Sequence, residues 1–251
     1  MLQPGCLESL RKGGYEKPIY IQTQVGVDET IFVPDLKLRS TYKKKIGFED
    51  DFVIGYTGRL TVDKGVDDLV SVFIALAQKK SDLALLLVGN GELREVLDKQ
   101  FLDAGLSDRV FITGFVDQAD VPNYMNAMDV FVLGSKTMPH WIDTFPLVTV
   151  QAQAIGIPVI ASDSASIPWQ LADTAGIYLE GNRAELKQML YDFIENKQLR
   201  ENFSERGRRR SLENFCHAGM TENFKLIVEQ IMSEKPCYHE ENDPYTQWKA
   251  Y

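Results

Sequence analysis

Two cations lie on one short connection of the sequence, the stretch TGRLTVDKG at residues 57–65. Arg59 offers a planar guanidinium fork and Lys64 a mobile ammonium, a pair suited to holding a diphosphate. Gly58 and Gly65 flank the cations, and a glycine lets the backbone approach a ligand closely. A helix that begins directly after such a loop also favours an anion at its N-terminus. A helix start with two solvated cations fits the same residues equally well.

A second polar stretch, DTFPLVTVQAQAIGIPVIA, runs from Asp143 to Ala161. Its end predicts a tight turn followed by a buried strand, so the residues before the turn are predicted to form a helix. This helix carries Gln151 and Gln153 where acidic side chains would be expected in an active site. The stretch is a working binding site, a weakened site, or a helix that only packs on a sheet.

Composition and charge narrow the class of protein. Hydrophobic residues make up 44% and charged residues 25% of the 251 residues, which is typical of a soluble globular protein with a core. The net charge of −9 argues against nucleic acid as the main partner. Cys6, Cys216 and Cys237 have no metal or redox spacing, which favours reduced thiols. Without a run of transmembrane length or a signal-peptide pattern, we expect a cytoplasmic protein.

Short β-branched runs alternate with longer amphipathic segments from about residue 51 onward. The expected strands lie at 52–58, 83–89, 109–114, 130–135, 158–162 and 176–180, and the expected helices at 66–80, 92–105, 121–128, 145–156 and 184–197. This alternation predicts an α/β fold, a Rossmann-like, doubly wound, mostly parallel sheet with helices at the C-terminal end. Such sheets bind ligands where the carboxyl ends of the strands lead into loops.

Several segments outside this alternation also carry predictions. PIYIQTQVGV at 18–27 predicts a further strand, and the acidic, aromatic tail after Glu234 predicts an extended segment. The RGRRR run at 206–210 lies among glutamates in a helical pattern, which predicts an exposed face with salt bridges rather than a membrane or nucleic-acid surface. Gly89 and Gly91 lack the third glycine of a dinucleotide motif, so we expect a tight turn against a ligand or neighbouring backbone.

The order of motifs resembles the C-terminal, donor-binding domain of GT-B glycosyltransferases of family 4, the group 1 glycosyltransferases. The motifs GRL…DKG, LLLVGNGE, VFITGFV, VPNYMNAMDVFVLGS and D-x7-Q-A-x-A-x-G-x-PVIAS follow one another from about residue 52 to 162, and the resemblance continues to about residue 216. It implies an interdomain-type linker and remnant of the N-terminal half at 1–45, a nucleotide-sugar-binding domain at 46–232 and a C-terminal tail at 233–251.

The resemblance also implies a site for a UDP-, GDP- or ADP-sugar, with no metal and no other cofactor. Arg59 and Lys64 would hold the diphosphate and stabilise it as it departs. Asp143 and Gln151 take the positions of the family's two glutamates, which typically contact the donor sugar and the ribose. The other implied donor contacts are Gly58, Gly89 and Gly91 in the first two loops, Gly114, Phe115 and Val116 near the base, Ser135 before the sugar loop, and Phe145 and Leu147 at the helix start.

The chain departs from the family pattern at four positions in or near this site. Asp143 is one methylene shorter than glutamate, and Pro146 has no N–H to offer a phosphate. Trp169 stands where relatives often carry an acid. Gln151 cannot make a charge-assisted bond, which is expected to weaken donor binding about tenfold. The pattern therefore fits either an altered donor or an enzyme that has lost activity.

The leading hypothesis is the donor-binding domain of a retaining, metal-independent glycosyltransferase that acts on a glycan or a lipid-linked acceptor. The resemblance implies that an N-terminal acceptor domain, which usually supplies a histidine contact, is separate or missing. His140, His217 and His239 do not replace that histidine. Attachment to the inner membrane face is at most peripheral. Two alternatives are a non-catalytic partner subunit of a complete glycosyltransferase and an enzyme like UDP-GlcNAc 2-epimerase.

Overall fold

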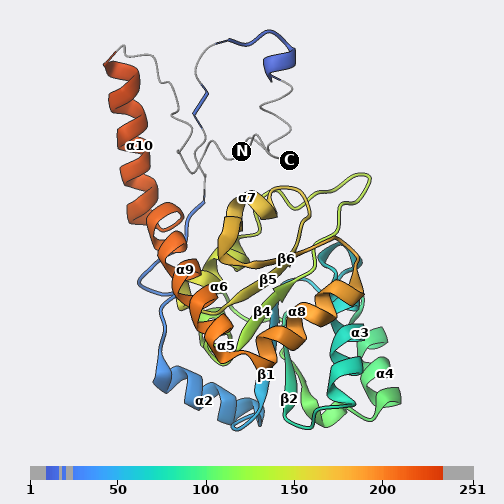
Figure 1. Ribbon diagram of the computed structural model, residues 1–251. Coiled ribbons are helices and arrows are strands. Elements are labelled where there is room, and N and C mark those ends of the chain that lie inside the picture. The colour runs from blue at the N-terminus through green and yellow to red at the C-terminus, as the bar shows by residue number, and fades with distance from the viewer. Residues whose placement is uncertain (1–9, 17–18, 21–24, 234–251) are drawn as a thin grey trace.

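The computed structural model describes residues 10–16, 19–20 and 25–233 and contains a single six-stranded sheet (Figure 1). The strands are β1 (Phe52–Thr57), β2 (Leu83–Val88), β3 (Val110–Ile112), β4 (Val130–Leu133), β5 (Val159–Ser162) and β6 (Gly176–Tyr178). Their order is β3-β2-β1-β4-β5-β6, and every neighbouring pair is parallel. The chain thus winds outward in both directions from the β1–β4 pair, which confirms the predicted doubly wound fold.

The central strands are buried because helices cover both faces of the sheet. All six residues of β2 are buried, as are all four of β4 and of β5. These strands consist mostly of Val, Leu, Ile and Ala, so they have no polar face to present to water. The β1–β4 junction is the point at which the direction of winding reverses, and such a point is where sheets of this class bind ligands.

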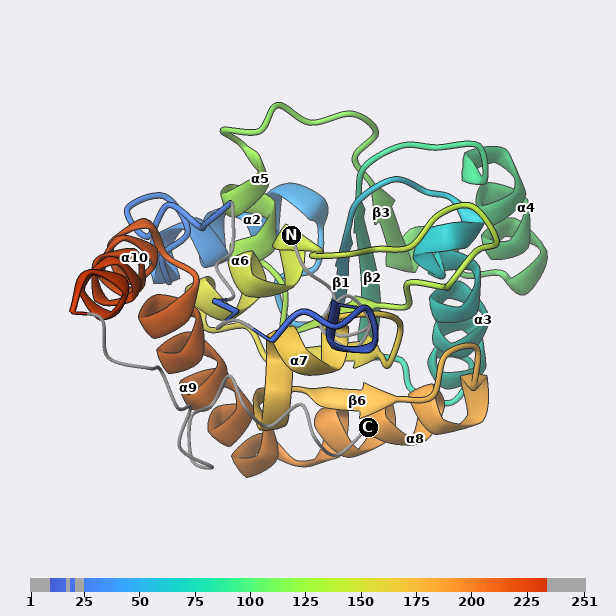
Figure 2. The same cartoon turned by 90° about the horizontal axis from the view of Figure 1, so that it is seen from above.

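Two groups of helices cover the sheet. The described helices are α2 (Leu36–Ile46), α3 (Val66–Ala77), α4 (Arg94–Ala104), α5 (Val121–Asn126), α6 (Leu147–Ile155), α7 (Ile167–Leu171), α8 (Arg183–Glu195), α9 (Lys197–Asn214) and α10 (His217–Met232), with short 3₁₀ turns at Val62–Lys64, Ser107–Arg109 and Ala172–Thr174. Figure 2 shows α3, α4 and α8 on one side of the sheet and α2, α5, α6 and α9 on the other. The contacts agree, since α3 packs against α8 and α6 against α9.

The segment before β1 differs from the strand predicted at 18–27. Its described residues, 19–20 and 25–27, contain no strand, and Val27 forms only an isolated parallel bridge with Cys216. The other residues of that segment lie outside the described part of the chain. The helix that follows, α2, was not predicted. Its signals were present in the sequence, because Asp35 caps its first turn and Gly47 ends it in the left-handed conformation.

The RGRRR run lies in α9, as its helical pattern predicts, but its arginines do not form the expected salt bridges with glutamates of the same helix. Arg206 pairs with Asp173, whereas Arg208 donates to the backbone carbonyl of Ala154. Arg210 donates to the carbonyls of Trp169 and Gln170, both at 2.9 Å. The prediction of an exposed face with salt bridges holds for Arg206, which pairs with Asp173, and Arg209 is exposed, but Arg208 and Arg210 instead fasten α9 to the backbone of α6 and α7.

Helix α10 extends away from the body of the domain (Figure 1). Its residues are exposed or half-buried, and the exposed ones include Phe224, Ile231 and Met232. Among the helices described here, none is both long and apolar enough to cross a membrane. The tail predicted after Glu234, with His239 and Cys237, lies outside the described residues, as does Cys6.

Candidate functional site

The loop after β1, residues 58–65 and here called the β1 loop, is held rigidly at the carboxyl edge of the sheet. The buried Tyr56 hydroxyl donates to the carbonyl of Arg59 at 2.5 Å. Burial raises the pKa of Tyr56, with Asp63 and Asp143 adding to the effect, so the hydroxyl remains a donor. This bond fixes the backbone from which the two predicted cations project.

Glycines let the loops of this edge pack backbone against backbone. A Cβ on Gly91 would lie 2.4 Å from the carbonyl oxygen of Leu60, and one on Gly89 would lie 1.9 Å from that of Gly58. A Cβ on Gly65 would lie 1.8 Å from the carbonyl oxygen of Gly134. The sequence predicted that Gly89 and Gly91 lie against either a ligand or neighbouring backbone. In the structure they lie against the backbone of the β1 loop.

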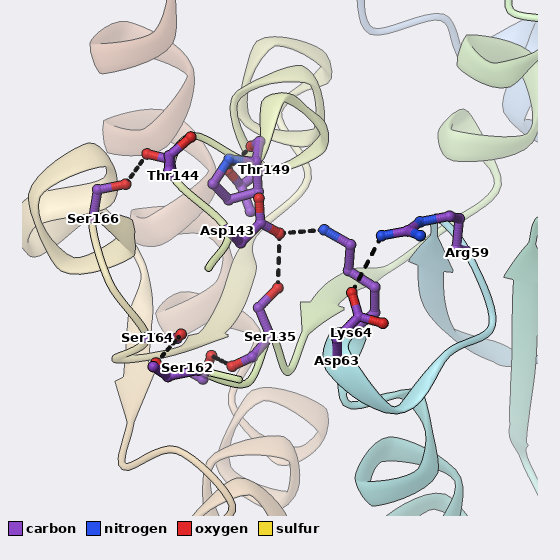
Figure 3. Close-up of polar contacts among 12 residues, drawn as sticks. Arg59, Asp63, Lys64, Ser135, Asp143, Thr144, Thr149, Ser162, Ser164 and Ser166 are labelled. Atoms are coloured by element: carbon purple, nitrogen blue, oxygen red, sulfur yellow. Dashed lines mark hydrogen bonds and ion pairs between the residues drawn. The ribbon is translucent and has the colours of Figure 1, made fainter. Parts of the chain in front are cut away.

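Three side chains predicted for the site meet between the ends of β1 and β4 (Figure 3). The Lys64 ammonium lies 2.5 Å from Oδ2 of Asp143, and the Ser135 hydroxyl donates to the same oxygen at 3.0 Å. The side chains of Lys64 and Asp143 are only 15% and 9% exposed. The carbonyl of Ser135 accepts a hydrogen bond from Ser162 at 2.6 Å, so β5 supports the group from below.

Arg59 comes from the same loop as Lys64 but is far more open to solvent. Its guanidinium lies 3.2 Å from Asp63, four residues later, and its side chain is 62% exposed. An exposed pair of this kind constrains its members weakly. Arg59 is therefore available to an incoming anion, whereas Lys64 is already paired.

The loop after β4, residues 134–146 and here called the β4 loop, adds a residue that the sequence analysis missed. The Trp141 ring centroid lies 4.2 Å from the Lys64 nitrogen and 5.7 Å from the guanidinium carbon of Arg59. Paired backbone hydrogen bonds between Met138 and Trp141 shape the loop that presents the ring. An aromatic face attracts cations at this range, so the ring covers both. The only signal in the sequence was an aromatic residue two positions before Asp143.

The base of the β4 loop is fastened to the rest of the domain. Lys136 lies 3.0 Å from Asp67 and 2.9 Å from Asp68, and Arg183 from α8 also contacts Asp68. Burial disfavours the Lys136 ammonium, but the hydrogen bonds to both carboxylates outweigh this and raise its pKa. The hydroxyl of Thr137 donates to Glu180 at 2.9 Å. These contacts fix the start of the β4 loop, and at its other end the Ser166 hydroxyl donates to the carbonyl of Thr144, next to Asp143.

Helix α6 separates the two glutamines of its sequence into different environments. Gln153 packs against α9 and donates to the Thr174 hydroxyl at 2.8 Å, which makes it a structural residue. Gln151 is 3% exposed, and its amide makes no hydrogen bond within the described residues. Its amide atoms are not among the fully buried side-chain atoms without a partner, whereas Oε1 of Gln153 is. The Gln151 amide therefore keeps a small contact with solvent, and a polar ligand can supply the hydrogen bonds that the chain does not.

The start of α6 also carries Phe145, Pro146 and Leu147. The helix begins at Leu147, with Pro146 as its N-cap residue. Phe145 packs against Trp169 and Phe215, with ring centroids 6.5 and 5.6 Å apart. Trp169 therefore belongs to an aromatic cluster that supports the start of α6. The resemblance implies an acidic residue at the position of Trp169.

The loop after β3 reaches the same edge of the sheet. Gly114 adopts the left-handed conformation with φ of 72° and forms an isolated bridge with Gly89. Phe115 is 86% exposed, and Val116 is half-buried against the core. The predicted base-contacting residues thus lie beside the loop after β2, which packs against the β1 loop that carries Arg59 and Lys64.

The chain matches the family model described as "Glycosyl transferases group 1" over residues 39–210. The chain belongs to this family. A relative from Corynebacterium glutamicum, named GDP-mannose-dependent monoacylated alpha-(1-6)-phosphatidylinositol monomannoside mannosyltransferase, is 28% identical over 219 residues. That match covers 77% of this chain and 57% of the relative. The chain thus spans little more than half the length of this relative.

Solved structures show the same fold. The C-terminal domain of a group 1 glycosyl transferase, LpcC from Francisella tularensis, matches with a TM-score of 0.67 and 21% identity, over 76% of this chain and 100% of that one. HepE from Anabaena in complex with UDP matches with a TM-score of 0.75 and 22% identity, over 92% of this chain and 62% of that one. The predicted resemblance to a GT-B C-terminal domain is confirmed.

The histidines of this group 1 chain lie apart from the site or outside the described residues. His140 is exposed at the tip of the β4 loop. His217 begins α10, where it lies with Asp28 and Glu29 within metal-binding distance. Asp28 already accepts hydrogen bonds from Thr30, which lower its pKa. These carboxylates have protein partners, and nothing in their geometry requires a metal ion.

Proposed function

We propose that residues 46–232 form the donor-binding domain of a retaining, metal-independent glycosyltransferase. The donor is a nucleotide diphosphate-sugar, and the acceptor is a glycan or a lipid-linked saccharide. The observation that carries the proposal is the meeting of Lys64, Asp143 and Ser135 at the switch point of the sheet, with Arg59 beside them. Family membership over residues 39–210 supports the choice of reaction.

The residues divide into three roles in this proposal. Arg59 and Lys64 bind the diphosphate and stabilise the negative charge that develops as the sugar leaves. Asp143 accepts hydrogen bonds from sugar hydroxyls, and Gln151 offers its unpartnered amide to the ribose. The β3–α5 loop around Phe115 borders the base.

The acceptor site belongs to a separate or further part of the enzyme in this proposal. Its support is that the chain spans 57% of the C. glutamicum relative. We therefore expect the chain alone to bind nucleotides and to show little or no sugar transfer. Its working place is the cytoplasm, with at most peripheral contact with the membrane that carries a lipid-linked acceptor.

A second candidate is a non-catalytic partner subunit that keeps the fold. It is favoured by Gln151, which cannot supply a carboxylate, and by Pro146, which cannot donate an N–H to a phosphate. Activity of the complete complex separates the two candidates. Arg59→Ala in this chain abolishes sugar transfer if this site is catalytic and leaves it unchanged if another subunit provides the site.

Calorimetry with GDP, UDP and ADP tests the proposal directly. GDP comes first because the C. glutamicum relative is named as GDP-mannose-dependent. We expect one nucleotide to bind, and Lys64→Ala to weaken that binding about 10- to 100-fold, since a hydrogen bond to a charged group is lost. The exposed Lys99→Ala on α4 is the control and leaves the affinity unchanged. Absence of binding by all three at millimolar concentration would rule the proposal out.

A further inference from the structure

Lys64 is engaged on two sides before any ligand arrives. Oδ2 of Asp143 lies 2.5 Å from its nitrogen. The centroid of the uncharged Trp141 ring lies 4.2 Å from the same nitrogen. With its side chain 15% exposed, the ammonium has little open surface to offer an anion. A diphosphate that is to bind Lys64 must therefore change the surroundings of this ammonium.

Asp143 is bound less completely than its burial would suggest. Both of its hydrogen bonds, from Lys64 and Ser135, reach the same oxygen, Oδ2. Within the described residues Oδ1 has no hydrogen-bond partner, although an ionised carboxylate can accept about four hydrogen bonds. Its second oxygen is thus available to a ligand that the chain does not supply.

Building on the proposed function, we propose that Asp143 is the resident counter-ion of Lys64, and that the donor's diphosphate displaces it. The released carboxylate then accepts hydrogen bonds from hydroxyls of the donor sugar. Phosphate and carboxylate repel each other within reach of one ammonium, so the more highly charged phosphate takes the cation. Sugar recognition is thereby coupled to diphosphate binding.

The surrounding contacts allow such an exchange. The β4 loop is fixed at its start by Lys136 and Thr137 and at its end by the hydrogen bond from Ser166 to the carbonyl of Thr144 (Figure 3). The exchange therefore requires only the side chains of Lys64 and Asp143 to turn, not the loop backbone. The Trp141 ring stabilises the cation without adding a negative charge. Lys64 therefore keeps its contact with the ring while its anionic partner changes.

The exchange makes an unusual prediction for a residue of the donor site. Because the diphosphate binds in competition with Asp143, Asp143→Asn is expected to tighten binding of the free nucleoside diphosphate, by about fivefold. The corresponding nucleotide-sugar gains nothing further, because the carboxylate that would hold its hydroxyls is gone. The ratio between the two affinities therefore falls in the variant.

Calorimetry with the nucleoside diphosphate that binds the wild-type chain best, and with one of its nucleotide-sugars, measures both effects. Asp98→Asn is the matched control, because Asp98 forms an exposed ion pair with Arg94 on α4, 2.7 Å apart. Its affinities are expected to equal those of the wild type. Unchanged or weaker diphosphate binding by a folded Asp143→Asn variant overturns the exchange and leaves the proposed function standing.

Thermal unfolding shows whether the variant is folded, and Asp143→Ser replaces it if it is not. The serine also removes the competing charge and fits the same space, so the expected tightening is the same. If the wild-type chain itself binds no nucleoside diphosphate, the proposed function fails before the exchange is reached. The two failures are thus distinguishable.

Discussion

One aspartate–lysine ion pair lies at the amino ends of the strands, here called the amino edge, and another lies at their carboxyl ends, here called the carboxyl edge. The two pairs are built differently. At the amino edge, Asp129 contacts Arg39 at 2.5 Å and Lys43 at 2.9 Å, and it also accepts the backbone N–H of Val53. At the carboxyl edge, Asp143 contacts Lys64 and Ser135 through one oxygen. The first carboxylate uses both oxygens and the second uses one.

The cations of the two clusters differ in the same way as the aspartates. Lys43 also donates to the carbonyl of Asp51, and Arg39 donates to the carbonyls of Asn126 and Met128. Lys64 has the Trp141 ring as its other contact. A charged group whose hydrogen-bonding capacity is filled by the chain serves the fold, whereas one with capacity left over can serve a ligand. The amino-edge cluster is therefore structural, and the carboxyl-edge cluster is the candidate site.

The largest expected effect is the loss of folding stability when each aspartate is replaced by alanine. Asp129→Ala leaves Arg39 and Lys43 without their anion, and we expect the free energy of unfolding to fall by about 3 kcal/mol. Asp143→Ala is expected to lower it less, by about 2 kcal/mol, because it breaks one ion pair and one hydrogen bond rather than two ion pairs and a backbone hydrogen bond. Denaturant unfolding measures both values.

Asp103→Ala is the control for these two variants, since Asp103 pairs with Lys99 on the exposed face of α4. Its expected effect is below about 0.5 kcal/mol. Equal losses at Asp129 and Asp143 would mean that both clusters are structural, and the division between the two edges would be wrong.

A smaller effect is expected from giving the carboxyl edge a second carboxylate. Gln151→Glu restores the charge-assisted bond to a ribose, so nucleotide binding is expected to tighten about tenfold. Without ligand the buried carboxylate has no partner, and the melting temperature should fall. Calorimetry and thermal unfolding measure the two opposite changes.

Gln153→Glu, two residues later on the same helix, is its matched control. It loses the amide that donates to Thr174, so it lowers stability without changing nucleotide affinity. If Gln151→Glu lowers stability and leaves affinity unchanged in the same way, Gln151 is a packing residue and has no contact with the ligand.

The fold was predictable because its signals are local and repeated. The strands predicted at 52–58, 83–89 and 158–162 are mostly apolar runs, and the structure has β1, β2 and β5 there, because parallel sheets are built from such runs. Gly105 and Gly156 end α4 and α6 in the left-handed conformation that glycine adopts readily. The segment 18–27 shows the limit of this reasoning, since its apolar alternation predicts a strand where its described residues form none.

The site was predictable in part. The motif order brings Lys64 and Asp143 to one edge of the sheet, although 79 residues separate them. That they form an ion pair was not predicted, because the pairing depends on the path of the β4 loop, which contacts distant in the sequence fix at Lys136, Thr137 and Thr144. Trp141 was missed for the same reason. The arginines of 206–210 reached backbone carbonyls of other helices, contacts that a pattern of charges within one helix does not encode.

The smallest expected effect concerns Phe115, on the carboxyl edge beyond the ion pair. The ring is 86% exposed, so Phe115→Ala should change the free energy of unfolding by less than about 0.5 kcal/mol. Nucleotide affinity should change less than about twofold, because the family resemblance places the loop backbone, not the ring, at the base.

Leu102→Ala, at an exposed position on α4, serves as the control for loss of an exposed apolar side chain. A loss of affinity of more than about fivefold in Phe115→Ala alone would mean that the ring stacks on the base, as aromatic rings do with about 1–3 kcal/mol per base. The ligand would then contact Phe115 in addition to Lys64 and Asp143. Phe115 would be a second residue of this edge, after Asp143, whose side chain the protein leaves without a partner of its own and the ligand contacts.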